Sequence, residues 1–233
     1  MTGLSAPWPI WGMRFALKRS AMSCDDMLCR PRRKAHDHMA DLYSDPPRAV
    51  GASDFFTAGV LTVRGLVTYY VLFFIHLDSR RVDIAGITIH PDEPWMKQIA
   101  RNATMEGCGV LRDCRYLLHD RGTKYTQAFR AIIASGQVKP LLLPACSPNL
   151  NAYAERWVRS VKEECLSKVI LFGERSLRRA LSEYVEHYHT ERNHQGRENV
   201  LLFPRDTDAH REAPVRCRQR LGGLLRYYHQ AAA

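Results

Sequence analysis

Three acidic residues, Asp54, Asp120 and Glu155, are of the type and spacing that could support phosphodiester chemistry. They lie in the segments DFFT (54–57), HDRGTKY (119–125) and PNLNAYAE (148–155), and positions 121 to 154, 34 residues, separate the second acid from the third. Hard divalent cations prefer carboxylate oxygens, and two-metal phosphoryl transfer holds its ions about 3.5–4 Å apart with ligands from separate elements. The three acids therefore predict a metal site, although each acid alone is most simply a surface carboxylate.

Four motifs follow one another along the chain. They are Asp-Phe-Phe at 54–56, Asp-x-Gly-Thr-x-Tyr at 120–125, Pro-x-x-Asn-Ala-x-x-Glu at 148–155 and Arg-Asn-His-Gln-Gly at 192–196. In this order they resemble the integrase catalytic core shared by retroviral integrases and many bacterial insertion-sequence transposases. The resemblance runs from about Asp54 to Pro204, and four ordered motifs are far more specific than one.

The resemblance implies DNA transposition or integration by metal-dependent phosphodiester hydrolysis and strand transfer. In this family two aspartates and a glutamate hold two Mg²⁺ or Mn²⁺ ions. Here Asp54 would bridge the ions, while Asp120 and Glu155 would each complete one site. The implied partners are element-end and target DNA, on which the protein would act as a homo-oligomer. No covalent enzyme intermediate and no catalytic histidine is needed.

Arg159 and Lys162 follow Glu155 by four and seven residues, which places all three on one stripe of a helix. The resemblance implies that both cations contact DNA near the scissile phosphate. The alternative for Arg159 is an intrahelical ion pair with Glu155, which contributes only a few tenths of a kcal/mol. His119, beside Asp120, either assists by hydrogen bonding or is simply the last residue of a strand.

The bulk composition is consistent with a polyanionic partner. The 233 residues contain 34 Lys and Arg against 24 Asp and Glu, a formal net charge of +10. Binding of such a chain to nucleic acid releases counterions. The seven cysteines lack the spacing of a disulfide framework and favour a reducing compartment. The longest apolar run is too short to cross a bilayer, so we expect a cytoplasmic, nucleoid-associated protein with no membrane partner.

The elements that must position the acids can be predicted from periodicity. We expect three consecutive strands, then strands and helices in alternation, and finally two helices, of which the first begins near Asn151, whose side chain can cap it. The expected strands are 55–63, 67–77, 82–89, 116–118 and 138–143, and the expected helices before Asn151 are 94–105 and 127–134. This order predicts an α/β fold with a mixed, ribonuclease-H-like sheet flanked by helices.

The chain divides into three predicted parts: residues 1–50 as an irregular N-terminal segment, possibly truncated or replaced, 51–204 as the catalytic core, and 205–233 as a basic tail that is solvated or faces DNA. A zinc set of Cys24, Cys29, His36 and His38 has poor spacing. Segment 1–50 shows no helix-turn-helix pattern, and residues 50–53 have weak strand propensity.

Two rival functions stay open: a non-catalytic DNA-binding remnant of a transposase, and a ribonuclease-H-like nuclease that cuts without joining.

Overall fold

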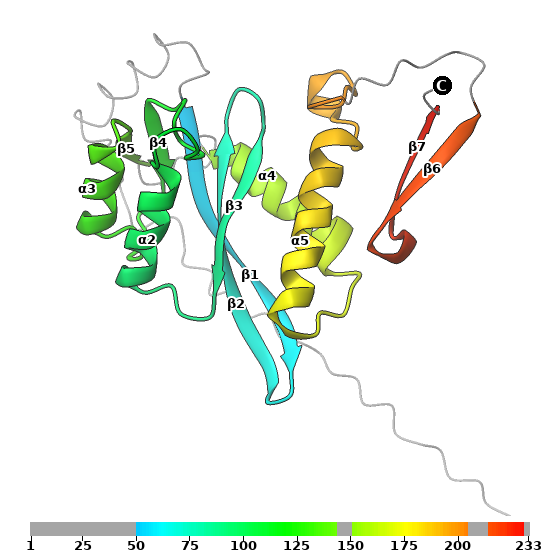
Figure 1. Ribbon diagram of the computed structural model, residues 1–233, viewed down its shortest axis with the longest axis horizontal. Coiled ribbons are helices and arrows are strands. Elements are labelled where there is room, and N and C mark those ends of the chain that lie inside the picture. The colour runs from blue at the N-terminus through cyan, green and yellow to red at the C-terminus, as the bar shows by residue number, and fades with distance from the viewer. Residues whose placement is uncertain (1–49, 144–150, 205–213, 231–233) are drawn as a thin grey trace, which may run out of the picture. The chain divides into compact units, whose positions relative to one another are not determined.

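A five-stranded mixed sheet forms the centre of the protein (Figure 1). The computed structural model describes residues 50–143, 151–204 and 214–230, so the cysteines and histidines that the sequence makes a poor zinc set lie outside the described residues. The strand order is β3-β2-β1-β4-β5. The strands are β1 (Val50–Thr62), β2 (Gly65–His76), β3 (Val82–Thr88), β4 (Tyr116–His119) and β5 (Lys139–Leu142). The first three strands are antiparallel, whereas β4 and β5 are parallel to β1, as a ribonuclease-H-like sheet requires.

The predicted hairpin between the first two strands is confirmed. Thr62 pairs with Gly65 across a tight turn, and Gly65 has φ 109°, in the region that favours glycine. The Thr62 hydroxyl donates to the Gly65 carbonyl at 2.9 Å and closes the turn. This turn fixes the register of β1 against β2, and therefore fixes which β1 side chains face each side of the sheet.

Strand β1 begins earlier than the sequence predicts. The prediction started the strand after Asp54, but the structure extends it back to Val50, and Ala52 and Ser53 are fully buried. The cause is tertiary pairing, because residues 50–53 run parallel to the whole of β4. Such pairing overrides the weak strand propensity of a Gly-Ala-Ser segment. Asp54 is consequently in the middle of a long strand.

Each face of the sheet carries a separate apolar core. Alternate residues of β2 point to opposite faces, so Phe73 and Ile75 join one cluster while Leu72 and Phe74 join the other. Figure 1 shows α2 and α3 on one side of the sheet and α4 and α5 on the other. These helices are α2 (Glu93–Ala103), α3 (Gln127–Ser135), α4 (Ala152–Val161) and α5 (Gly173–Thr190), and a π-helical turn, η3 (Lys162–Leu166), extends α4.

The two faces differ in what covers them. The α2 and α3 side is filled by Met96, Phe129 and Ile133, all fully buried. The other side is filled by Trp157 of α4 and by Leu177 and Tyr184 of α5, also fully buried. None of the helices in the described ranges is both long and apolar enough to cross a membrane. The fold class predicted from the sequence is confirmed by this layered arrangement.

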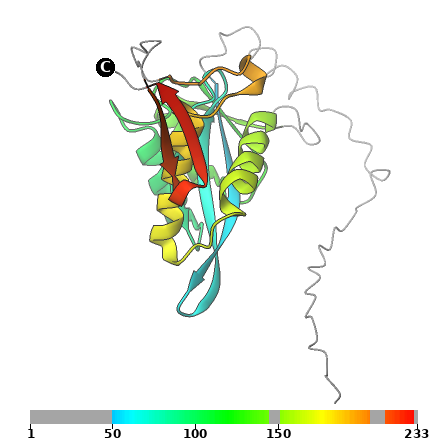
Figure 2. The same ribbon diagram turned by 90° about the vertical axis from the view of Figure 1, so that its right-hand side faces the viewer.

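The end of the chain contains an antiparallel hairpin, β6 (Val215–Arg220) and β7 (Leu225–Gln230), joined by the short turn η5 (Leu221–Gly223). In Figures 1 and 2 this hairpin runs alongside α5. The arginine-rich sequence predicts a solvated or DNA-facing tail here. Two of its arginines, Arg218 and Arg220, instead pair with the buried carboxylate of Glu191. Part of this arginine-rich segment is therefore a strand, β6, that contacts the end of α5 through Glu191.

Candidate active site

Asp54 lies in β1, and Asp120 is the residue directly after the neighbouring parallel strand β4. Ser53 of β1 pairs with His119 of β4, and each aspartate is the next residue along its chain. Asp54 is two residues from Ala52 and from Phe56, both of which belong to the core on the α4 side, so its side chain points to that face. Asp120 is two residues beyond Leu118, which belongs to the same core. Register and pleat thus bring both acids to the face that α4 covers.

The third acid, Glu155, is contributed by the first turns of α4, which packs on this face through Ala154 and Trp157. The helix is joined to Asp54 directly: the Asn151 amide Nδ2 donates to Asp54 Oδ2 at 3.3 Å. The predicted role of Asn151 as a side-chain helix cap is wrong, because Asn151 occupies the cap position without a side-chain capping hydrogen bond. The Asn151 Nδ2 is used by Asp54, and the buried Oδ1, the atom that could accept a capping bond, has no hydrogen-bond partner among the described residues.

The pKa of Asp54 is affected by the other two acids. Burial raises the pKa of Asp54 above its usual value, and the negative charges of Asp120 and Glu155 raise it further. Hydrogen bonds from the Phe55 backbone N–H, at 2.7 Å, and from Asn151 act in the opposite direction. Three carboxylates therefore share one region, and the most buried of them is held at a cost that a cation would offset.

The oxygen atoms of the aspartates currently accept hydrogen bonds from their own chain. Asp120 Oδ1 accepts from the Gly122 backbone N–H at 3.0 Å, and Asp54 Oδ1 accepts from Phe55. Among the described residues, no group of three or more His, Cys, Asp or Glu side chains is arranged closely enough to hold a metal ion. The donor set, three carboxylates and no thiolate, is nevertheless the set that Mg²⁺ and Mn²⁺ prefer.

A buried cluster behind the acids supports the strand ends that carry them. Ser53 Oγ and Tyr125 Oη are hydrogen-bonded at 2.9 Å, and the Tyr125 ring lies 4.9 Å from the His119 ring. His119 Nδ1 donates to the Asp120 carbonyl oxygen at 2.8 Å, and burial lowers the pKa of His119. His119 is thus the last residue of β4, as expected, and its hydrogen bond fixes the backbone at Asp120.

Sequence reasoning missed Asn151 and Tyr125 as supporting residues. Both stand at named positions of the motifs, Asn151 in Pro-x-x-Asn and Tyr125 in Asp-x-Gly-Thr-x-Tyr, and those positions were the available signal. Their contacts join residues 97 and 72 positions apart, which a local pattern cannot reveal.

Arg159 and Lys162 are exposed on the outer side of α4 and η3. No ion pair joins Arg159 to Glu155 in the described part of the chain, although the two residues have the spacing for one. The intrahelical pair that competed with DNA contact is therefore not formed. Glu155 is left with its carboxylate exposed, and both cations remain accessible from solvent.

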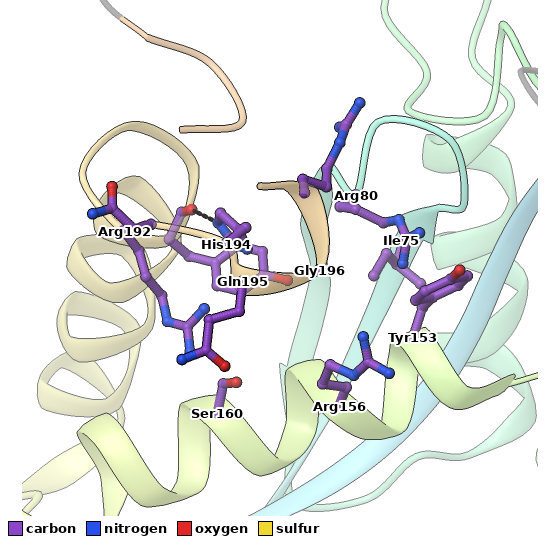
Figure 3. Close-up of a pocket in the computed structure, with 12 residues that line it drawn as sticks. Ile75, Arg80, Tyr153, Arg156, Ser160, Arg192, His194, Gln195 and Gly196 are labelled. Atoms are coloured by element: carbon purple, nitrogen blue, oxygen red, sulfur yellow. Dashed lines mark hydrogen bonds between the residues drawn. The ribbon is translucent and has the colours of Figure 1, made fainter. Parts of the chain in front are cut away.

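The fourth motif, Arg192–Gly196, follows α5 and does not join the acids. It borders a separate cavity with Tyr153, Arg156 and Ser160 of α4 (Figure 3). Within the motif, the His194 Nε2 donates to the Tyr188 carbonyl at 2.8 Å, the contact drawn as a dashed line in Figure 3. None of the three acids lines this cavity.

Comparison with known proteins agrees with this architecture. Residues 137–200 match the family model described as integrase core domain, a segment that contains Glu155, Arg159 and Lys162. The catalytic domain of Mos1 mariner transposase is similar, with a TM-score of 0.51 and 12% identity over 66% of this chain and 78% of that chain. The HTLV-2 integrase catalytic core domain, solved in complex with magnesium, gives a TM-score of 0.49 and 11% identity over 67% of this chain and 94% of that chain. No curated protein matches the sequence.

The likeness to the Mos1 catalytic domain shows a shared fold and nothing more, because the sequence identity is only 12%. The matched segment adds the part of the sequence that carries the third acid and the fourth motif. Together they support a core of the DDE integrase and transposase class with a ribonuclease-H-like fold, which is the class that the four motifs predict.

Proposed function

We propose that this protein catalyses DNA transposition or integration by metal-dependent phosphodiester hydrolysis and strand transfer, with Asp54, Asp120 and Glu155 as the catalytic and metal-holding residues. One observation supports it above others: Asp54 in β1 and Asp120, the residue directly after the parallel strand β4, each follow one member of the pair Ser53–His119, on the side of the sheet that α4 covers with Glu155. Burial and the negative charges of Asp120 and Glu155 all raise the pKa of Asp54, a cost that a bound cation would offset.

Asp54, Asp120 and Glu155 would together hold the metal ions. When bound, two Mg²⁺ or Mn²⁺ ions supply activation of water and stabilisation of the attacking and leaving oxygens. The chain's own part is to orient the ligands and the DNA. Asn151 holds Asp54 Oδ2, and His119 holds the backbone of Asp120. The exposed Arg159 and Lys162 would contact phosphates next to Glu155, where cations mainly position the duplex.

The wider assignments belong to the same proposal. The partners are element-end and target DNA, the protein acts on DNA as a homo-oligomer in the cytoplasm, and residues 51–204 form the catalytic domain between segments 1–50 and 205–233. The net charge of +10 supports a polyanionic partner.

The decisive variant is Asp120→Asn. It should abolish Mn²⁺-dependent nicking and strand joining while duplex binding stays nearly unchanged, because it removes a charged ligand and deletes no phosphate contact. The assay supplies a precut donor end in trans with supercoiled target DNA, so that poor end recognition cannot mask the chemistry. Asp113→Asn is the matched control, since Asp113 is an exposed carboxylate in the turn before β4 and pairs only with Arg112 among the ion pairs of the described residues.

Three results would change the assignment. Activity that survives in the Asp120→Asn protein would contradict the proposed site. An unaltered protein that binds such DNA but neither cuts nor joins it, at any divalent-ion concentration, would be a non-catalytic remnant. A protein that cuts and never joins would be a ribonuclease-H-like nuclease.

A further inference from the structure

A cavity of about 430 Å³ lies between α4, the turn that joins β2 to β3, and the segment after α5 (Figure 3). Four arginines line it, and no aspartate or glutamate does. We call it the arginine pocket, and its residues used below are Arg80, Tyr153, Arg156, Ser160, Arg192 and Arg197. Figure 3 shows Arg156 and Tyr153 projecting from α4 into the space between that helix, Arg80 and the short helical turn η4 (Gln195–Arg197).

Only one of the four guanidinium groups is neutralised. Arg192 Nη2 donates to Glu164 Oε1 at 2.6 Å, in a forked pair that uses Nε as well. Arg80, Arg156 and Arg197 make no ion pair with a carboxylate in the described ranges. Three positive charges thus border one cavity with no carboxylate of the described residues paired to them, an arrangement that attracts an anion.

Arg80 is held in the pocket at a visible conformational cost. Its φ of 63° is in the left-handed region, which costs a non-glycine residue about 1 kcal/mol. The guanidinium carbon lies 3.0 Å from the centre of the Tyr153 ring, and the buried Nε has no hydrogen-bond partner within the described residues. Burial lowers the pKa of Arg80, and the charges of Arg197 and Arg156 lower it further. A buried, unpaired guanidinium donor indicates that a ligand acceptor belongs there.

The arginine pocket opens on a different side of α4 from the proposed catalytic stripe. At 3.6 residues per turn, Arg159 and Lys162 lie within about 40° of Glu155 around the helix axis, whereas Arg156 lies about 100° and Ser160 about 140° away. A ligand in the pocket would therefore not be the phosphate that the acids and Lys162 contact.

We propose that the arginine pocket binds a second backbone phosphate of DNA, away from the reacting one. The planar fork of donors on a guanidinium group can bind two oxygens of one phosphate, and the Ser160 hydroxyl can add a further donor. Arg80 covers the Tyr153 ring, so the ring is not free to stack on a base, and the contact would be independent of sequence. The choice of DNA as the source of the phosphate rests on the proposed function. In this arrangement one strand would pass over α4 and be held at two points.

The test measures duplex binding without divalent ions, so that no cutting or joining contributes. Arg156→Gln and Arg197→Gln should each weaken binding and reduce the slope of log affinity against log salt by about 1, the effect of one lost phosphate contact. Arg156→Lys should restore the slope, since it returns the charge. Arg101→Gln is the matched control, because Arg101 is exposed on α2, on the opposite face of the sheet, and its loss should leave the slope unchanged.

Arg156 and Arg197 are both exposed, and circular dichroism will show whether each variant folds. If one fails to fold, the other decides. A second arm follows the thermal unfolding midpoint in inorganic phosphate against chloride of equal ionic strength. Phosphate that protects the unaltered protein but not Arg156→Gln, with an unchanged DNA slope, would mean a free phosphate site and would overturn the DNA proposal.

An equal loss of slope in Arg101→Gln would show only a general surface field and would also overturn the proposal. The proposal would also be overturned if Arg156→Gln weakened binding of a polyglutamate peptide and left DNA binding unchanged. Because every arm reads binding in the absence of metal, a failure of the pocket leaves the Asp120→Asn result intact, and the reverse holds too.

Discussion

At the scale of single residues, Asn151 links the helix that carries one acid to the strand that carries another. Asn151→Ala removes the donor that orients Asp54 Oδ2. Loss of such an outer contact to a metal ligand typically costs about 10-fold or more in metal affinity or activity. We therefore expect the Mn²⁺ concentration for half-maximal nicking to rise about 10-fold.

A Mn²⁺ titration of nicking measures this effect. Asn102→Ala is the control, since Asn102 is an exposed amide on α2 whose side chain is hydrogen-bonded only to Gln98 among the described residues. If Asn151 acted mainly as a helix cap, the change would instead cost about 1 kcal/mol of stability and leave the Mn²⁺ dependence unchanged.

At the scale of elements, Glu191 joins the end of α5 to the β6–β7 hairpin. Its side chain is 1% exposed, and its oxygens accept from Arg220 at 2.7 and 2.8 Å and from His187 at 3.1 Å. Burial by itself would raise the pKa of Glu191, but these donors outweigh it and hold the pKa at about 2, below the ordinary 4.5. The pairing therefore stabilises the fold above about pH 4.5 and loses that contribution as the pH falls toward 2.

Glu191→Gln should lower the free energy of unfolding at pH 7 by about 3 kcal/mol, because it removes the closest counter-charge of Arg220 and leaves it only the longer contact with Glu186, at 3.9 Å. The difference between the variant and the unaltered protein should shrink as the pH falls below 4.5. Urea unfolding at a series of pH values measures both effects. Glu174→Gln, which removes an exposed pair with Arg178, serves as the control and should change little. A difference that stays constant with pH would contradict the assigned role of Glu191.

Most of the secondary-structure elements, but not all, could be predicted from the sequence. Hydrophobic alternation predicted the strands, and the motifs predicted a ribonuclease-H-like fold with two acids from the sheet and a third from a helix, because both signals are local or follow a known order. The start of β1 could not be predicted, since residues 50–53 become a strand only by pairing with β4. The same holds for Asn151, whose acceptor is 97 residues away, and for β6, whose arginines looked solvated until Glu191 was placed beside them.

At the scale of the whole molecule, the excess of 34 basic over 24 acidic side chains should dominate the encounter with DNA. Phosphate neutralisation gives a slope of about −0.9 in log affinity against log salt for each contact. Arg159, Lys162 and the arginine pocket lie on two sides of α4, so a duplex that engages both sides should show a slope steeper than about −2.

Lys162→Ala should reduce this slope by about 1 and weaken binding similarly for every sequence, because Lys162 would contact a phosphate and not a base. Fluorescence anisotropy across a salt series measures the slope, with a duplex taken from the DNA that flanks the coding sequence and a scrambled duplex of equal length. Equal slopes and affinities for the two duplexes are the expected result, since backbone contacts carry no sequence information. A strong preference for the flanking duplex would instead place a base-reading element in residues 1–50 or 205–233, and a flat salt dependence would remove the electrostatic account altogether.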